Sequence, residues 1–210
     1  IRTLENLMKT SINNKSDNEQ PSIGSMLKKN YGSMDQITSL YILMFEYLEI
    51  PHELVVTNSR MDAKIDPDFD TWSLLNDYLI YFPFSGKYLD PINYLYRYGM
   101  VPFVYSENNG LFTKKITIGD VSNSLSSVRK IEATNFEQNY DNMFATISFE
   151  NGMKETKIVM KREFGGHADN LVRPAYFYSN EENREKLVDD LLESTFKDTK
   201  SKDVKLLNYD

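Results

Sequence analysis

The chain contains no cysteine, and this absence removes several chemistries at once. Among its 210 residues there is no thiol to form a disulfide, to bind zinc as a thiolate or to act as a nucleophile. Histidine is almost as scarce, with His52 and His167 as the two examples. Because catalytic zinc needs about three protein ligands in one shell, two histidines so far apart argue against a zinc site. We expect His52 to be a turn residue and His167 a loop residue.

Positive charge is also in short supply. Lys and Arg number 24 against 31 Asp and Glu, which gives a net charge of −7, and no basic cluster is longer than Lys28-Lys29 or Lys114-Lys115. Binding to nucleic acid or to anionic membranes needs such clusters to neutralise phosphates, so neither partner is expected. No apolar run approaches the roughly 20 residues that span a bilayer. The glycines form no phosphate-binding loop, since Gly165-Gly166 lacks the Lys and Ser/Thr that would follow, and no cofactor is expected.

The residues that are present predict a folded chain of one or two domains. Hydrophobic residues make up 40% and aromatic residues 13% of the sequence, which is enough for a core. Apolar residues at helical spacing predict helices over residues 1–12 and Ser22–Asn30, the second ending at Gly32. The chain opens without Met in what is already a helix, which indicates a piece of a longer protein.

The strongest helical signal runs from Ile37 to Leu48. It is apolar nearly all round, so it predicts a buried central helix. Ser33 precedes it with Gln36 three residues further on, which is the pattern of a capping box. Together with the strands described next, this helix makes the expected fold class α+β.

Strands are predicted over Glu53–Thr57 and Asp77–Phe84, with a turn at Ser85-Gly86 leading into residues 87–91. Twelve of the 27 aromatic residues lie between Phe69 and Tyr105. They could line a groove, but aromatic strands that pack a core with their hydroxyls reaching water are the more usual arrangement.

The C-terminal part has a different pattern. Residues 119–134, rich in serine, are predicted to be a linker between a first domain, residues 1–118, and a β-rich unit, residues 135–210. Asn151-Gly152 between two strand-like runs predicts a hairpin. One helix, Glu181–Phe196, and a final strand, Val204–Leu207, follow in a mainly β unit. This order leaves open that the unit is incomplete at Asp210.

Three segments together resemble a known family. Tyr31-Gly32-Ser33-Met34-Asp35 opens the buried helix, Leu75-Asn76-Asp77-Tyr78-Leu79-Ile80 begins a strand, and Tyr88-Leu89-Asp90-Pro91 follows. They resemble the catalytic motifs of the transglutaminase-like branch of the papain-type superfamily. That family has a Cys at the helix N-terminus, a His that opens the next strand and an Asp in a Leu-Asp-Pro motif. The helix lowers the thiol pKa, the His takes the proton and the Asp orients the imidazole.

The resemblance places Ser33 at the Cys position, Asp77 at the His position and Asp90 at the Asp position. It covers roughly residues 20 to 118, including Met100-Val101-Pro102. Weaker likeness continues into Asn151-Gly152, Gly165-Gly166 and Arg173-Pro174, which look like the β domain that follows this core in a class of exported bacterial proteins. The resemblance therefore implies a location in the cell envelope or periplasm. Such proteins usually carry another β domain upstream, in agreement with the start at Ile1.

Two of the three catalytic residues are replaced, so we expect a catalytically inactive domain. A serine hydroxyl needs a base, and a carboxylate with an ordinary pKa near 4 is a poor one. The expected role is a binding or scaffolding module for a peptide, protein or glycan in an aromatic-rich cleft. The alternative is a peptidase or amidase that uses Ser33 with Asp77 and Asp90 at acid pH. A third possibility is a structural spacer between β modules.

One acidic segment could bind a metal. Asp66, Asp68 and Asp70 alternate along the chain and would supply oxygen ligands to calcium. The segment lacks the Gly and the distal Glu of an EF-hand loop, so a solvated acidic loop is the favoured interpretation.

Overall fold

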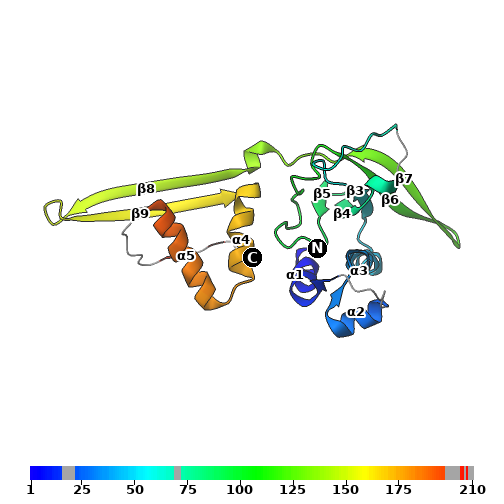
Figure 1. Cartoon of the computed structure of the whole chain (residues 1–210), viewed down its shortest axis with the longest axis horizontal. Helices are drawn as coiled ribbons and strands as arrows, with labels where there is room; N and C mark the ends of the chain where they lie inside the picture. The colour runs from blue at the N-terminus through cyan, green and yellow to red at the C-terminus, as the bar shows by residue number, and fades with distance from the viewer. Residues whose placement is uncertain (16–21, 69–71, 197–203, 206, 208–210) are drawn as a thin grey trace. The chain divides into compact units, whose positions relative to one another are not determined.

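The structure is a computed structural model that describes residues 1–15, 22–68, 72–196, 204–205 and 207. Helices and strands are mixed, as expected for an α+β chain. The chain divides into two compact units, Ile1–Thr134 and Asn135–Asp210 (Figure 1). Each unit is described separately below.

The three predicted helices of the first unit are confirmed. They are α1 (Arg2–Ser11), α2 (Ile23–Lys29) and α3 (Met34–Tyr47). The expected stop of α2 at Gly32 is wrong, because Asn30 ends the helix in the left-handed region at φ 58°. Asparagine tolerates this conformation better than most residues. Gly32 lies instead in the short strand β2 (Tyr31–Gly32), which pairs in parallel with β1 (Asn13–Asn14).

The capping box at the start of α3 is confirmed. The backbone N–H of Gln36 donates to Ser33 Oγ at 3.3 Å, and the backbone N–H of Ser33 donates to Gln36 Oε1 at 2.9 Å. Asp35 adds a negative charge in the first turn, where the helix dipole favours it. The position of the α3 N-terminus is thus encoded locally in four residues.

The sheet of the first unit has five antiparallel strands in the order β5-β4-β3-β6-β7. The strands are β3 (Glu53–Thr57), β4 (Asp77–Phe82), β5 (Lys87–Leu89), β6 (Asn109–Ile118) and β7 (Val121–Lys130). The bounds predicted for β3 are confirmed. The second predicted strand ends two residues early, and a turn then leads into β5, so that β4 and β5 form a hairpin.

The linker predicted over residues 119–134 is wrong. Most of it is β7, which pairs with the whole length of β6. Two of its serines bond to threonines of β6: Thr113 Oγ1 lies 2.9 Å from Ser126 Oγ, and Thr117 Oγ1 lies 3.0 Å from Ser122 Oγ. Ile131 follows the strand and is fully buried in the core of the first unit. A Ser-rich strand is easily misread as a linker, since its composition is that of a loop.

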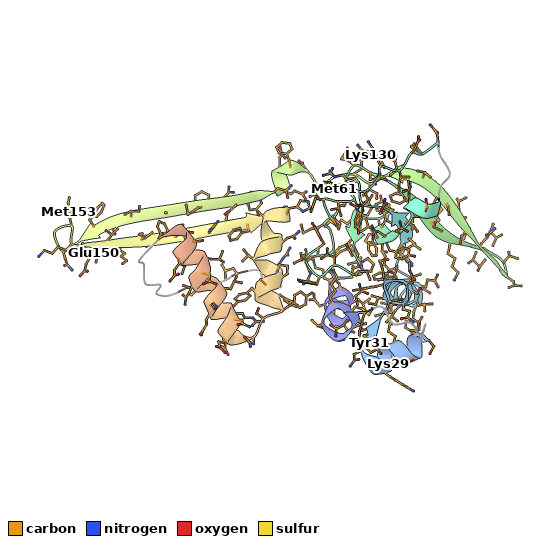
Figure 2. All side chains as sticks on the ribbon, viewed as in Figure 1. Lys29, Tyr31, Met61, Lys130, Glu150 and Met153 are labelled. Atoms are coloured by element: carbon orange, nitrogen blue, oxygen red, sulfur yellow. The ribbon has the colours of Figure 1, made fainter. Side chains whose placement is uncertain are left out.

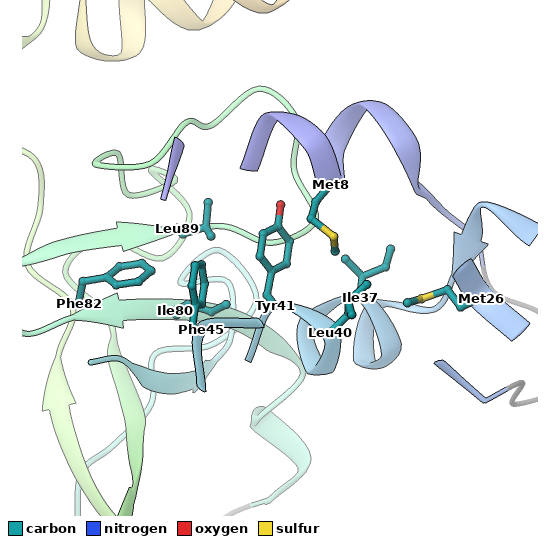
Figure 3. Packing of buried hydrophobic residues seen from close by; sticks show 9 residues of the cluster. All are labelled: Met8, Met26, Ile37, Leu40, Tyr41, Phe45, Ile80, Phe82 and Leu89. Carbon is teal, nitrogen blue, oxygen red and sulfur yellow. The ribbon is translucent and has the colours of Figure 1, made fainter. Parts of the chain in front are cut away.

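The sheet is packed on both faces around β4, whereas β7 is exposed along its whole length. Figure 3 shows one core, in which α3 and parts of α1 and α2 meet β4 and β5. Its buried members are Met8, Met26, Ile37, Leu40, Tyr41, Phe45, Ile80, Phe82 and Leu89. A second core contains Val55, Leu79, Tyr88, Val101, Phe112 and Ile131. Ile80 and Leu79 are neighbours in β4 but belong to different cores, as the alternation of a strand requires.

The expectation that α3 is buried all round is wrong in part. Tyr41 and Phe45 are fully buried, but Tyr47 is 87% exposed and Leu43 about half exposed. The helix covers the sheet with one side only. Isolated apolar side chains are common on protein surfaces, so the apolar composition of α3 overstated its burial.

Five residues of the dense aromatic segment lie in or against the two cores, namely Tyr81, Phe82, Tyr88, Tyr98 and Tyr105. Phe84, Tyr94 and Phe103 are more than half exposed. Phe82 makes edge contacts with Phe45 and Tyr98, with ring centroids 5.2 and 5.3 Å apart. Tyr88 lies in the second core. Of the remaining members, Phe69 and the side chain of Trp72 lie outside the described residues.

A buried ion network joins α1 to residues 93–98. Glu5 is fully buried, and both of its carboxylate oxygens accept from the backbone N–H of Tyr98 at 3.0 Å. Lys9 Nζ lies 3.0 Å from Glu5 Oε1, and Arg97 Nε lies 3.5 Å from Glu5 Oε2. Both cations are almost completely buried. A carboxylate in this position is tolerated because two cations and a backbone donor surround it.

The second unit contains the hairpin predicted at Asn151-Gly152. Its strands are β8 (Tyr140–Glu150) and β9 (Glu155–Gly165), paired over their full length. Asn151 and Gly152 have φ of 51° and 66°, the conformation that this pair favours. Glu150 and Met153, labelled in Figure 2, mark the loop end of the ribbon.

The predicted helix Glu181–Phe196 is confirmed as α5, but the expectation that it is the single helix of a mainly β unit is wrong. The described part of the unit contains α4 (Arg173–Phe177) as well as α5 (Glu181–Thr195) and a 3-10 helix, Gly166–Leu171. Pro174 lies in the first turn of α4, where proline is well tolerated. Of the final predicted strand, Val204, Lys205 and Leu207 are not in a strand, and residue 206 lies outside the described residues.

The capping box predicts a stability loss on substitution. Ser33→Ala should lower the free energy of unfolding by about 1 kcal/mol, within a range of about 0.5 to 2 kcal/mol, because the Gln36 amide loses its acceptor. Ser39→Ala, at an exposed position of the same helix, is the control and should change it by less than about 0.5 kcal/mol. Chemical denaturation measures both, and equal effects would contradict the capping role.

The buried network predicts a larger effect. Glu5→Gln should lower the free energy of unfolding by about 3–5 kcal/mol, because Lys9 and Arg97 would remain buried without their counter-charge. Glu46→Gln is the matched control, since the Glu46–Lys115 pair is partly exposed and should contribute at most about 1 kcal/mol. If the two variants lost similar amounts of unfolding free energy, the described buried ion pairs of Glu5 would be contradicted.

Candidate functional site

Two of the three positions singled out by the sequence line one pocket of about 510 Å³. Asp77 begins β4, and Asp90 directly follows β5. Because β4 and β5 are antiparallel neighbours, the start of one lies beside the end of the other. Met34, the first residue of α3, also lines this pocket. We call it the Asp77–Asp90 pocket; its other lining residues are Met8, Lys9, Ile12, Asn13, Asn14, Ile37, Tyr78, Pro91, Ile92, Asn93, Tyr94 and Tyr105.

Ser33 directly precedes Met34, a residue that lines this pocket. The Ser33 hydroxyl caps the N-terminus of α3. Its oxygen accepts the Gln36 backbone N–H, and Met34 rather than Ser33 is among the residues that line the pocket. Tyr78 directly follows Asp77 in β4. Its hydroxyl group donates a hydrogen bond to the carboxylate of Asp35 in the first turn of α3. The first residues of β4 are thereby tied to the helix N-terminus.

Asp77 is a carboxyl with a raised pKa. Partial burial is the main cause, and the negative charge of Asp62 acts in the same direction. A hydrogen bond from the Tyr105 hydroxyl and a backbone bond from Ser59 oppose the shift, since both stabilise the charged carboxylate. The pKa of Tyr105 is itself raised, first by burial and then by the charges of Asp90 and Asp77.

Asp90 supports a turn. Its Oδ1 accepts the backbone N–H groups of Ile92 and Asn93, each at 2.9 Å. The carboxyl is 4% exposed, and burial raises its pKa against the opposing effects of these bonds and of the Lys9 charge. Asp90 therefore has a clear structural task, which is to fix the chain that forms one wall of the pocket.

Lys9 also lines the pocket, but its ammonium group is occupied. It donates to Glu5 Oε1 at 3.0 Å and to the carbonyl oxygens of Asn93 and Tyr96 at 2.9 and 2.6 Å. These three bonds use all three of its protons. Burial lowers its pKa, although the charges of Glu5 and Asp90 oppose the change. Lys9 is therefore a structural cation, and the polar groups that line the pocket besides it are carboxyl, tyrosine and asparagine side chains.

Neither histidine lies at this pocket. His52 Nδ1 is 2.7 Å from the Ile50 carbonyl oxygen, so it must carry the proton and donate. The His52 ring packs against Phe45 and borders a second, wider groove of about 1180 Å³ between α3 and strands β6 and β7. His167 belongs to the second unit, where burial lowers its pKa. An imidazole base is thus missing from the Asp77–Asp90 pocket.

The acidic segment at Asp66 forms a local turn. Asp66 Oδ1 accepts the backbone N–H of Asp68 at 2.9 Å, and Asp70 lies outside the described residues. Within the ranges that the structure describes, there is no group of three or more His, Cys, Asp or Glu that could hold a metal ion. No helix in those ranges is long and apolar enough to cross a membrane.

Comparisons with known proteins give no relative: no family model, no curated protein and no solved structure matches the chain. The pocket must therefore be interpreted from its own chemistry.

Sequence reasoning missed Tyr105, Glu5 and Lys9. For the last two a signal existed, because Glu5 and Lys9 are four residues apart and adjoin the apolar side of the first helix at Met8. Such a pair beside an apolar stripe indicates a buried ion pair. Tyr105 carried no local signal, since its partner Asp77 lies 28 residues earlier in the chain.

The environment of Asp77 predicts a measurable titration. Tyr105→Phe should raise the pKa of Asp77 further, because the carboxylate loses a hydrogen bond that favours its charged form. Carbon-detected NMR of the Asp77 carboxyl measures the change. Tyr98→Phe is the control. The Tyr98 hydroxyl bonds to Ser85, so this substitution should leave the pKa of Asp77 unchanged. A pKa that falls in Tyr105→Phe would contradict the described bond.

The raised pKa of Asp77 also determines how the free energy of unfolding depends on pH. The folded pKa of Asp77 is above its unfolded value, so the unfolded chain holds fewer protons between the two values. This group therefore makes the folded state less stable as pH rises through that window. In Asp77→Asn this contribution disappears, and the stability difference between variant and wild type should move in favour of the variant as pH rises. Denaturation over an acid-to-neutral series would refute this if the difference did not change with pH.

Proposed function

We propose that the first unit is a catalytically inactive transglutaminase-like domain that binds a peptide, protein or glycan at the Asp77–Asp90 pocket. One observation carries the proposal: the residues at the family's His and Asp positions line one pocket beside the helix that begins after Ser33, but no thiol or imidazole is present there. In a larger exported bacterial protein, such a unit would act as a binding or scaffolding module.

The absence of a base argues against acyl transfer. A serine hydroxyl must lose its proton during attack, and a helix N-terminus alone does not ionise it at neutral pH. The Ser33 oxygen already accepts the Gln36 amide. Asp90 is held by two backbone N–H groups, and Asp77 accepts from Tyr105. Each member of the set therefore has a structural partner, and none is paired with a second member as in a catalytic triad.

The pocket suits a binding role. Ligand sites commonly enclose about 300–1,000 Å³ and combine an apolar lining with a few polar groups. Here Met34, Ile37 and Ile92 supply apolar surface, and Tyr78 and Tyr94 offer aromatic rings. Tyrosine rings can stack on peptide or sugar groups, and carboxyl oxygens accept hydrogen bonds from amides and hydroxyls. These features support a peptide, protein or glycan as the ligand.

The enzyme alternative has one supporting observation. Asp77 and Asp90 share a pocket, and burial raises the pKa of each. Carboxyl groups that keep a proton at mildly acid pH can serve as general acids. A peptidase or amidase that uses Ser33 with these two residues would then be active at acid pH.

Restoring the family's residues tests the proposal. The double variant Ser33→Cys/Asp77→His should hydrolyse members of a mixed peptide library, and each single variant should stay at background. The unmodified chain should show no hydrolysis between about pH 3 and 8, the range over which carboxyl and imidazole groups titrate. Activity of the unmodified chain that Ser33→Ala abolishes would establish the enzyme alternative. A folded double variant without activity would contradict the family assignment.

Binding is tested separately on the unmodified chain. Amide NMR spectra recorded with the same peptide library and with a glycan panel should show shifts at residues of the Asp77–Asp90 pocket. Asp77→Asn should weaken them, whereas Asp66→Asn, outside the pocket, should not. No shifts with either panel would contradict a binding role and favour a structural spacer.

A further inference from the structure

In the described part of the second unit, no strand pairs with the outer edge of β8. Strands β8 and β9 form a two-stranded sheet, and no other described strand pairs with either. Every second backbone N–H and C=O of β8 therefore points away from β9. A two-stranded hairpin alone is at best marginally stable in water. Its free edges are templates for a further strand unless side chains block them.

The two edges differ in their protection. β9 carries Lys157 and Lys161 together with acidic residues at 155 and 163, whereas its Arg162 donates to both carboxylate oxygens of Asp141 in β8 at 2.8 and 2.7 Å. β8 has charges only near its ends, at Asp141 and Glu150, and residues 142–149 carry none. Charged side chains, lysine above all, are the usual means of blocking an edge strand. The edge of β9 is blocked in this way, whereas that of β8 is open.

An exposed apolar row lies along β8. By strand alternation Met143, Ala145, Ile147 and Phe149 share one face, and the three large side chains among them are 51 to 64% exposed. On β9 the same face is covered near Arg162, which bonds to Thr195 of α5 at 3.3 Å; Figure 1 shows the C-terminal end of α5 next to β9 and the rest of the helix slanting away from it. The helix thus leaves the β8 half of this face open.

We propose that β8 pairs in antiparallel orientation with β8 of a second copy of this chain, about a two-fold axis at Ala145, to give a four-stranded sheet. The proposal concerns the second unit and is independent of the function proposed for the first.

The charges of β8 favour an antiparallel over a parallel, in-register pairing, and an axis at Ala145 is compatible with its apolar row. In the antiparallel register Met143 lies opposite the partner's Ile147, and Asp141 lies opposite the partner's Phe149, so no like charges meet. A parallel, in-register pairing would place Asp141 beside its own copy and Glu150 beside its own copy. Like charges directly opposite each other destabilise a sheet. The apolar rows of the two copies then form one continuous surface.

Sedimentation equilibrium of the whole chain tests the assembly. The mass should be about twice the 24.5 kDa of one copy. Ile147→Lys should give a monomer, because the new charge would face the partner's Met143. Val159→Lys is the control: Val159 is 63% exposed on β9 and the dimer should persist. A thermal melt shows that each variant is folded. The proposal would be overturned if the wild-type chain were monomeric or if the dimer persisted in Ile147→Lys. It would also be overturned if both variants lost the dimer to the same extent.

Disulfide trapping tests the register. The chain has no cysteine, so a single one can be introduced without competition. A residue on the two-fold axis lies opposite itself, with Cβ atoms about 4.5–5.5 Å apart, close enough for a disulfide after a small adjustment. Ala145→Cys should form a covalent dimer that a reductant reverses, whereas Val159→Cys should not. A dimeric chain in which Ala145→Cys does not cross-link, or in which both variants do so equally, would exclude this register.

Discussion

The buried carboxylate of Glu5 is the constraint on which most of the first unit depends. A charge in this position is stable only with partners on several sides, and they come from α1 itself and from the chain segment at residues 97 and 98. Lys9 extends the same network to the carbonyl oxygens at 93 and 96. The wall of the Asp77–Asp90 pocket is thereby attached to the first helix, although more than 80 residues separate them in the sequence.

Two kinds of interaction hold the walls of the Asp77–Asp90 pocket in place. The N-terminus of α3 is fixed locally by its capping box, and the two carboxyls are fixed by the hairpin of β4 and β5. Tyr78 connects these two parts through Asp35. Both parts of the pocket wall are therefore held by hydrogen bonds within the chain.

The sequence predicted local features well and long-range ones poorly. The three helices of the first unit, β3 and the Asn-Gly hairpin each have a signal within a few residues, and all are confirmed. The strand β7 was mistaken for a linker because its serine-rich composition is that of a loop. Tyr105 could not be linked to Asp77, because that contact joins distant segments. The Glu5–Lys9 pair had a local signal in its i, i+4 spacing, but the contacts of this pair with residues 93–98 had none. The closeness of Asp77 and Asp90 was expected from the family resemblance rather than from spacing.

The packing of the sheet on both faces around β4 has a consequence for sequence change. In β4 neighbouring residues such as Leu79 and Ile80 serve different cores and are both fully buried, so neither side of the strand is open to polar replacement. The far half of the β6–β7 hairpin is exposed on almost every residue. Mutations should therefore accumulate along a gradient, slowly in β4 and quickly toward the tip of that hairpin. Divergence would first alter the rim of the unit and last the strand that presents Asp77.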